Sequence, residues 1–257
     1  MSLTARLRSK WQRETSRRLG RRMRKMSNRE PLISFTFDDF PASALHVAGR
    51  MLAEKKVSGT YYTSFGLMNT VAPTGPVFNP RDIPLLLEQG HELGCHTYHH
   101  LHSYNTSSAE FEASILSNRA ALAEHAPGRQ FTTLSYPISG ARPSTKRRCE
   151  SYFAACRAGG QVPNTGQADL NALRSFFLEQ SQDDFYLIEK ALEYTVEQAG
   201  WLIFSTHDVC ANPTPYGVTS DFFQTVVEAS VRSGAKLVPV SEGLKEIGLR
   251  LEEPHIV

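Results

Sequence analysis

Two histidines four residues apart, His96 and His100, are the residues in this sequence best suited to bind a metal ion. Side chains at that spacing share one face of a helical turn, so both imidazoles can bind one divalent ion such as zinc. Two adjacent aspartates, Asp38 and Asp39, directly follow an apolar segment. Adjacent strand residues point to opposite sides, so one aspartate can reach the ion while the other stands beside it. Two imidazoles and one carboxylate leave positions open for water and substrate, which is the pattern of a catalytic metal site.

These residues must come together through the fold, because the aspartates and a third polar pair, His207-Asp208, are more than 100 residues apart. The apolar patterns predict strands alternating with helices, which implies parallel strands joined by crossover helices. The predicted strands are 32–37, 59–65, a short strand ending at 96, 132–136, 152–157, 201–205 and 236–240. The predicted helices are 42–56, 81–89, 107–124, 182–198, 221–233 and 241–247. We therefore expect an α/β fold, a closed or nearly closed (β/α) barrel of about six or seven units, with the three polar clusters at the carboxyl ends of its strands.

The strand Ser34-Phe-Thr-Phe-Asp-Asp39, followed by Gly90-His-Glu-Leu-Gly-Cys-His-Thr-Tyr-His-His100, resembles the first two motifs of the NodB-like polysaccharide deacetylases. These enzymes form the fourth carbohydrate esterase family. Thr133-Leu-Ser-Tyr-Pro137 is similar to a divergent middle motif, and Leu202-Ile-Phe-Ser-Thr-His207 is similar to the last motif. The resemblance extends from residue 31 to about 247 and implies a distorted barrel of about seven β/α units.

The resemblance also implies roles for single residues. Asp39, His96 and His100 would bind the divalent metal, which we expect to be Zn²⁺. Asp38 would be the general base and His207 the general acid. The segment at Tyr136 and Pro137 would contact substrate and shape the acetyl pocket.

The sequence departs from the family pattern at two places. Phe40 stands where the family usually has glycine, directly after the paired aspartates. The middle motif usually supplies an arginine before its prolines, but Ser135 and Tyr136 occupy that stretch. Arg157 is our first choice for the arginine that orients Asp38, and Arg174 is the second.

The charge distribution divides the chain into a basic arm, residues 1–29, and an acidic domain, residues 30–257. The arm holds eleven Lys and Arg against one acid, whereas the rest of the chain has a net charge of −8. A nucleic-acid-binding domain would carry its basic residues along the fold itself, so we expect no nucleic-acid partner. Leu3, Leu7 and Trp11 give the arm a thin apolar stripe, so residues 1–26 are either a solvated or docking segment or a peripheral membrane contact.

The four cysteines form no CxxC pair, and no apolar stretch resembles a signal peptide or a membrane span. We therefore expect a cytoplasmic protein, with a place at the inner membrane surface if the arm binds lipid.

The expected activity is metal-dependent removal of an N-acetyl or similar acyl group from an amino sugar or glycan precursor of the cell surface. Two other interpretations stay open. One is an iron oxygenase, which also uses two histidines and a carboxylate but on an antiparallel scaffold. The other is a non-catalytic, carbohydrate-binding module with a deacetylase-like fold.

Overall fold

Seven parallel strands form a closed barrel in the computed structural model, which describes residues 11–251 except residue 13. Their order around the barrel is β2, β3, β6, β7, β8, β10 and β11, and β11 pairs again with β2. The strands are β2 (Leu32–Phe37), β3 (Thr60–Thr63), β6 (Glu92–Cys95), β7 (Thr133–Ser135), β8 (Ala155–Gly159), β10 (Leu173–Phe177) and β11 (Trp201–Thr206). The expected barrel of about seven β/α units is confirmed.

The pairing of β11 with β2 is the longest in the barrel and closes it, and it places two site residues at the same height along the barrel. It runs in register from Trp201 against Leu32 to Thr206 against Phe37. Asp38 and His207 follow these last two partners directly, and the Asp38 amide donates to the Thr206 carbonyl oxygen at 3.0 Å. The register therefore brings both residues to the same end of the barrel.

The alternation along β2 decides which side chains face the interior. Phe35 packs against Phe223 of an outer helix, with ring centroids 5.6 Å apart. Ser34 and Thr36 point the other way, and the Thr36 hydroxyl donates to the Phe204 carbonyl oxygen at 2.7 Å. Continuing the alternation by two residues turns Asp38 into the barrel.

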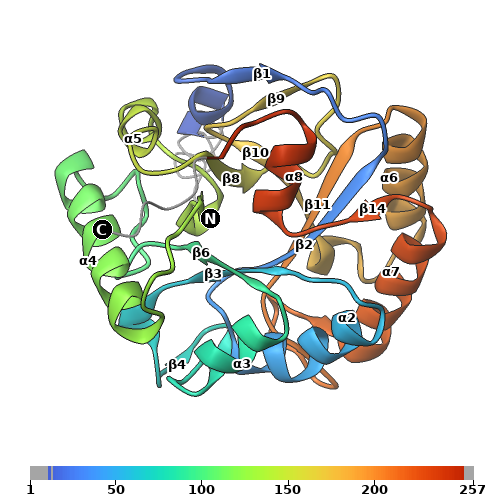
Figure 1. The fold of residues 1–257 in the computed structure, drawn as a ribbon, viewed down its shortest axis with the longest axis horizontal. Helices are drawn as coiled ribbons and strands as arrows, with labels where there is room; N and C mark the ends of the chain where they lie inside the picture. The colour runs from blue at the N-terminus through green and yellow to red at the C-terminus, as the bar shows by residue number, and fades with distance from the viewer. Residues whose placement is uncertain (1–10, 13, 252–257) are drawn as a thin grey trace.

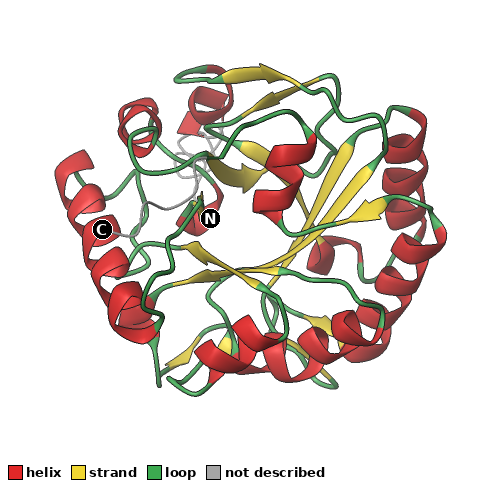
Figure 2. Cartoon of the chain, viewed as in Figure 1, coloured by secondary structure: helices red, strands yellow, loops and turns green. Residues whose placement is uncertain are grey.

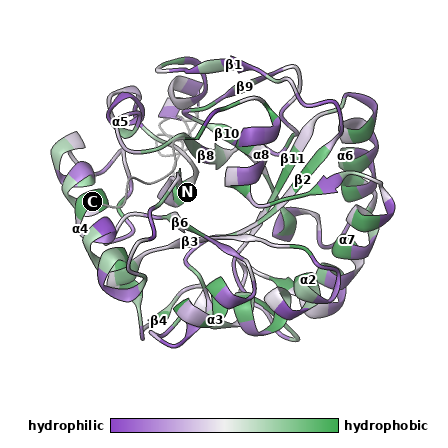
Figure 3. Cartoon of the chain, in the orientation of Figure 1, coloured by the Kyte–Doolittle hydropathy of each residue, from purple (hydrophilic) through white to green (hydrophobic). Residues whose placement is uncertain are grey.

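A ring of helices surrounds the strands (Figures 1 and 2). In Figure 3 these helices mix hydrophilic and hydrophobic residues along their length, as expected for helices with one buried face. The helices are the π-helix η1 (Ala44–Gly49), α2 (Arg50–Glu54), α3 (Asp82–Glu88), α4 (Ser108–His125), α5 (Pro143–Cys149), α6 (Tyr186–Glu197), α7 (Ser220–Arg232) and α8 (Val240–Glu246), with the 3₁₀ turns η2 (Phe65–Leu67), η3 (Pro137–Ser139) and η4 (Leu178–Ser181).

Helix α8 closes the amino-terminal end of the barrel. Its Val240 and Leu244 belong to an apolar cluster with Leu32 and Trp201, which begin their strands. Gly243 permits this approach, because a Cβ there would lie 2.4 Å from the Trp201 ring. The opposite end, where the strands finish, is left for the polar residues.

Several predicted elements differ in extent from the observed ones. The predicted helix 42–56 is divided between η1 and α2, and the strand predicted at 236–240 is only β14 (Lys236–Leu237) before α8 begins. The sequence pattern did not predict β10 or helix α5. The other short pairings are β1 (Met23–Lys25) with β9 (Gln167–Asp169), β4 (Val71–Ala72) with β5 (Gly75–Pro76), and β12 (Val209–Cys210) with β13 (Val218–Thr219).

The described part of the basic arm packs on the barrel. Its strand β1 pairs antiparallel with β9, and the Ser16 hydroxyl accepts a hydrogen bond from the Ala141 amide at 3.1 Å. Leu3 and Leu7 of the apolar stripe lie outside the described residues. Among the helices of the described residues, none combines the length and the apolar character needed to span a bilayer.

Candidate metal centre and active site

Asp39, His96 and His100 come together at the carboxyl-terminal end of the barrel. One ligand atom from each lies within 4.8 Å of the other two. Asp39 Oδ1 is 3.5 Å from His96 Nε2 and 3.2 Å from His100 Nε2. Asp39 follows β2 and His96 follows β6, so two separate strands deliver the ligands.

The donor set fits a divalent ion. Asp39 Oδ1 is buried without a hydrogen-bond partner, whereas Oδ2 accepts from the Thr74 hydroxyl at 3.1 Å. His96 Nδ1 lies 2.8 Å from the Ser135 carbonyl oxygen, which can only accept, so Nδ1 carries the proton and Nε2 keeps its lone pair. Burial lowers the pKa of His96 to about 4, so this imidazole is neutral at pH 7. The neutral imidazole of His96 and the unpaired carboxylate oxygen of Asp39 are ligands that zinc prefers.

Asp38 lies beside this triad and is paired with Arg157. The Arg157 guanidinium, which is 2% exposed, donates from Nη2 to both carboxylate oxygens of Asp38. It also donates to the hydroxyls of Ser135 and Ser175, each at 2.6 Å. Burial alone would raise the pKa of Asp38, but Arg157, with His96 and His207, lowers it well below its usual value. Asp38 is therefore ionised at neutral pH.

His207 follows β11 and is oriented by a backbone carbonyl. Its Nδ1 lies 3.0 Å from the Tyr216 carbonyl oxygen, so Nδ1 carries a proton and Nε2 is free for chemistry. Asp208 sets up this contact indirectly. Its carboxylate accepts from the Thr214 amide at 2.7 Å and the Thr214 hydroxyl at 2.6 Å, which fixes the loop that carries Tyr216.

Comparison with known proteins agrees with this geometry. Residues 25–152 match the family model described as polysaccharide deacetylase. The chain belongs to the NodB-like polysaccharide deacetylases. No curated protein matches the sequence.

Solved structures with the same fold extend over nearly the whole deacetylase domain. Peptidoglycan deacetylase PdaC of Bacillus subtilis gives a TM-score of 0.55 at 15% identity, covering 85% of this chain and 92% of that chain. The chitin deacetylase of Colletotrichum lindemuthianum gives a TM-score of 0.59 at 14% identity, covering 88% of this chain and 91% of that chain. A family 4 acetyl xylan esterase of Clostridium thermocellum, solved with a cobalt ion, gives a TM-score of 0.57 at 17% identity, covering 87% of this chain and 95% of that chain.

The two departures from the deacetylase pattern have local explanations. Asp39 and Phe40 both have positive φ, 61° and 50°, which glycine adopts more easily than other residues. The Phe40 ring is fully buried and stacks on Phe78 at 4.7 Å between centroids, so packing offsets the strain of this conformation. The absent middle-motif arginine is replaced by Arg157 from β8, while Arg174 packs against Gly160 instead.

The segment at Tyr136 and Pro137 differs from the sequence interpretation in one respect. Ser135 faces the barrel interior and Arg157, so the next side chain points outward. The Tyr136 ring is 2% exposed and lies 6.4 Å from Phe111 of α4, in the core outside the barrel. A ring in that position cannot stack on a sugar. The turn η3 comes next in the chain, and its Ile138 is 61% exposed and has a φ of 59°.

Glu179 is a neighbour of the site that sequence reasoning missed. It lies in η4, directly after β10. Burial raises its pKa to about 7, while the charges of His207, Asp38 and Arg157 also act on it. Its Oε2 is buried without a partner. The only sequence signal was its place after a strand, and that strand was not predicted.

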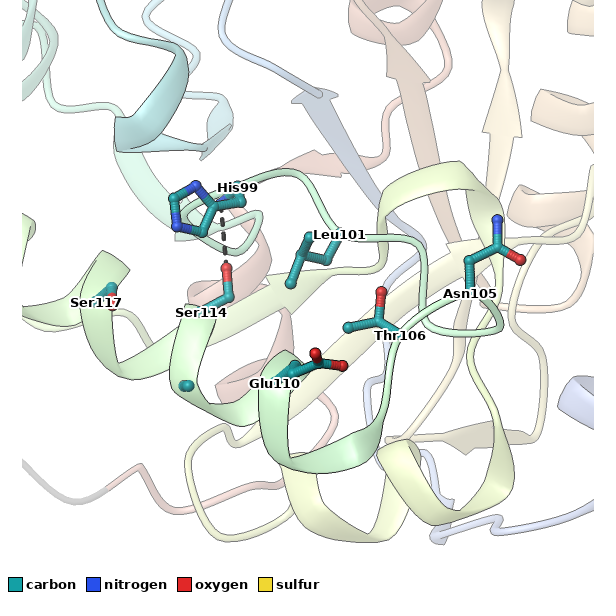
Figure 4. Close-up of a pocket in the computed structure, with 8 residues that line it drawn as sticks. His99, Leu101, Asn105, Thr106, Glu110, Ser114 and Ser117 are labelled. Atoms are coloured by element: carbon teal, nitrogen blue, oxygen red, sulfur yellow. Dashed lines mark hydrogen bonds between the residues drawn. The ribbon is translucent and has the colours of Figure 1, made fainter.

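An open hollow of about 420 Å³ lies beside the histidine loop. Figure 4 shows the residues that line it, with His99 and Ser117 toward one end and Asn105 and Thr106 toward the other. The His99 amide donates to the Ser114 hydroxyl at 3.1 Å, which holds the loop onto α4. None of the three candidate metal ligands lines this hollow, so it is separate from the triad.

Proposed function

We propose that the protein is a metal-dependent hydrolase that removes N-acetyl groups from an amino sugar of a glycan or glycan precursor. One observation carries the proposal: the Asp39, His96 and His100 ligand atoms converge, with an ionised carboxylate on one side. The similar structures of a peptidoglycan deacetylase and a chitin deacetylase support the substrate class, and the cobalt-bound esterase supports a divalent metal.

Asp38 is the general base of the proposed reaction. The chemistry that a divalent ion supplies at such a site is polarisation of the acyl oxygen and a lower pKa for bound water. Arg157 holds Asp38 ionised and fixes its orientation, so that one carboxylate oxygen takes a proton from the attacking water. Arg157 acts through Asp38 and is a positioning residue.

His207 is the general acid. Attack of water on the acetamide carbon forms a C–O bond, and the reaction ends when the C–N bond breaks. An amide nitrogen leaves poorly unless protonated. His207 gives that proton from Nε2 while it is the imidazolium, and it becomes the neutral ring that keeps its proton on Nδ1 toward the Tyr216 carbonyl oxygen. A backbone N–H after Pro137 supports the negative charge that develops on the acyl oxygen. The products are acetate and a free amine.

An acetate-release screen tests the proposal. The substrates are N-acetylglucosamine as the free sugar, as a nucleotide-linked sugar and as oligomers, each offered to metal-free protein with and without added zinc. We expect zinc-dependent acetate release from at least one of them. Zinc binding without acetate release from any N-acetylated sugar would favour the non-catalytic carbohydrate-binding alternative. A cytoplasmic location and membrane contact through residues 1–26 stay separate predictions.

A further inference from the structure

A second hollow, of about 340 Å³, lies between the amino-terminal segment and the loop that comes after the metal ligands. Its size falls within the range of small-ligand sites. It is lined by two aromatic side chains and several polar ones: Trp11, Tyr104, Gln12, Thr15, Arg142 and Ser144.

The two aromatic rings give the hollow an apolar platform. Trp11 is 62% exposed, and its ring lies 6.4 Å from that of Tyr104 at an interplanar angle of 67°. A pyranose ring has an apolar C–H face, which packs on an exposed indole, and a rim of hydroxyls, which needs donors and acceptors. Gln12, Thr15 and Ser144 supply polar atoms around the platform.

The polar groups favour a neutral ligand over an anion. Arg142, the cationic residue of this lining, already donates from Nε to the Ser103 carbonyl oxygen at 2.7 Å and from Nη2 to the Thr106 carbonyl oxygen. It is thus committed to holding the loop 103–106. A sugar fits this chemistry better than a phosphate does.

The hollow lies at the same end of the barrel as the metal ligands. Tyr104 is four residues after His100, in the loop between β6 and α4, and its hydroxyl donates to the Gln12 carbonyl oxygen at 2.8 Å. Ser16 binds the Ala141 amide in the loop after β7. The segment therefore bridges the loops that come after two neighbouring barrel strands.

A buried lysine anchors this segment to the barrel. Lys146 has no exposed surface, and its amine donates to the carbonyl oxygens of Ser16 and Leu19 at 2.9 and 3.1 Å. The same amine is 3.1 Å from Asp169. Breaking such a buried pair is costly, so the platform is held in place rather than loosely attached.

We propose that Trp11 and Tyr104 form an accessory subsite that binds a sugar ring of the glycan, while another residue of the same glycan lies at the metal ligands. This inference rests on the proposed function for its substrate class. Trp11 lies before residue 25, where the match to the family model begins, whereas Tyr104 lies inside the matched part of the chain.

Intrinsic fluorescence tests the subsite without any need for turnover. The chain has two tryptophans, and Trp201 is fully buried with its Nε1 bonded to the Ser34 hydroxyl, so a ligand-dependent change reports on Trp11. Zinc-loaded Asp38→Asn protein is titrated with N-acetylglucosamine oligomers of increasing length. We expect a saturable change with the longer oligomers, lost in a Trp11→Phe background. The matched control Leu19→Ala, an exposed apolar residue of the same segment, should keep it. No change with any oligomer would overturn the subsite.

Steady-state kinetics separates failure of the subsite from failure of the proposed function. Trp11→Ala should raise KM for a long N-acetylglucosamine oligomer about tenfold, the equivalent of about 1.4 kcal/mol of lost stacking. The variant should keep the wild-type kcat, and its activity on the free and nucleotide-linked sugars should be unchanged. Equal KM values for variant and wild type on long and short substrates would refute the subsite while acetate release upheld the function. A saturable Trp11 signal without acetate release from any substrate would refute the function and uphold the subsite.

Discussion

Replacing Arg157 by methionine should destabilise the protein by about 3–5 kcal/mol at pH 7. Methionine keeps an unbranched apolar stem but removes the positive charge beside Asp38, which is 6% exposed. The cost is large because the carboxylate would stay buried with no opposite charge, and the hydroxyls of Ser135 and Ser175 would each lose their donor. Burial, no longer opposed by Arg157, would then raise the pKa of Asp38 above its usual value.

The sign of the pH dependence is set by that shift. In the wild type the lowered pKa of Asp38 contributes stability above pH 4, which is lost only in strong acid. In Arg157→Met the raised pKa lets Asp38 take up a proton as the pH falls. The difference in free energy of unfolding between wild type and variant should therefore become smaller toward pH 5. Urea unfolding of metal-free protein at pH 7 and pH 5 measures both effects.

Two further variants serve as controls for this measurement. Arg129→Met, at an exposed arginine, should change the free energy of unfolding by less than about 0.5 kcal/mol. The double variant Asp38→Asn/Arg157→Met removes both charges and should recover part of the loss. A loss below about 1 kcal/mol for Arg157→Met, or no recovery in the double variant, would contradict a buried, charge-compensating pair.

Three other predictions concern single residues. Asp38→Asn should keep zinc and lower kcat by about 10²–10⁴-fold, measured by acetate release, with the exposed Asp183→Asn as a control; wild-type turnover would exclude Asp38 as the base. His100→Ala should weaken zinc binding by more than about 100-fold in a competitive chelator titration, since loss of outer-shell partners alone costs 10–100-fold, whereas His99→Ala should bind zinc as the wild type does. Burial lowers the pKa of His91 to about 4, so as the pH falls below 6.5 the unfolded chain binds a proton that the folded protein does not. The free energy of unfolding therefore falls by roughly 3 kcal/mol between pH 6.5 and pH 4 through this residue. The stability difference between wild type and His91→Phe should shrink by that amount across this range, and a difference that does not vary with pH would refute the assignment.

Much of the barrel and the metal triad could be predicted from the sequence because both depend on local patterns. The alternation of β2 ends at Asp38-Asp39, and the Ser107 capping box with Glu110 marks the start of α4. The motif around His96 and His100 is contiguous, so together with Asp39 it indicated shared ligation. The helical turn expected between the two histidines is wrong: residues 96–100 form a non-helical bend in which Thr97 and His100 have positive φ, 59° and 51°.

The residues that support the site were harder to predict, because their positions depend on strand neighbours. Arg157 on β8 reaches Asp38 although β10 and β11 separate β8 from β2 in the barrel, so the sequence could rank it above Arg174 but not show the contact. Glu179 follows β10, a five-residue strand that includes an arginine and lacks a clear alternation. Tyr136 points outward because the strand's alternation puts Ser135 inside, which the Tyr-Pro motif alone did not reveal.

Asp39, His96 and His100 are expected to hold one divalent ion together. Anomalous diffraction from a crystal of the zinc-loaded protein locates that ion. We predict a single strong zinc peak about 2.0–2.2 Å from Asp39 Oδ1 and the two Nε2 atoms. A zinc peak elsewhere on the protein, or none between these three side chains at saturating zinc, would contradict it.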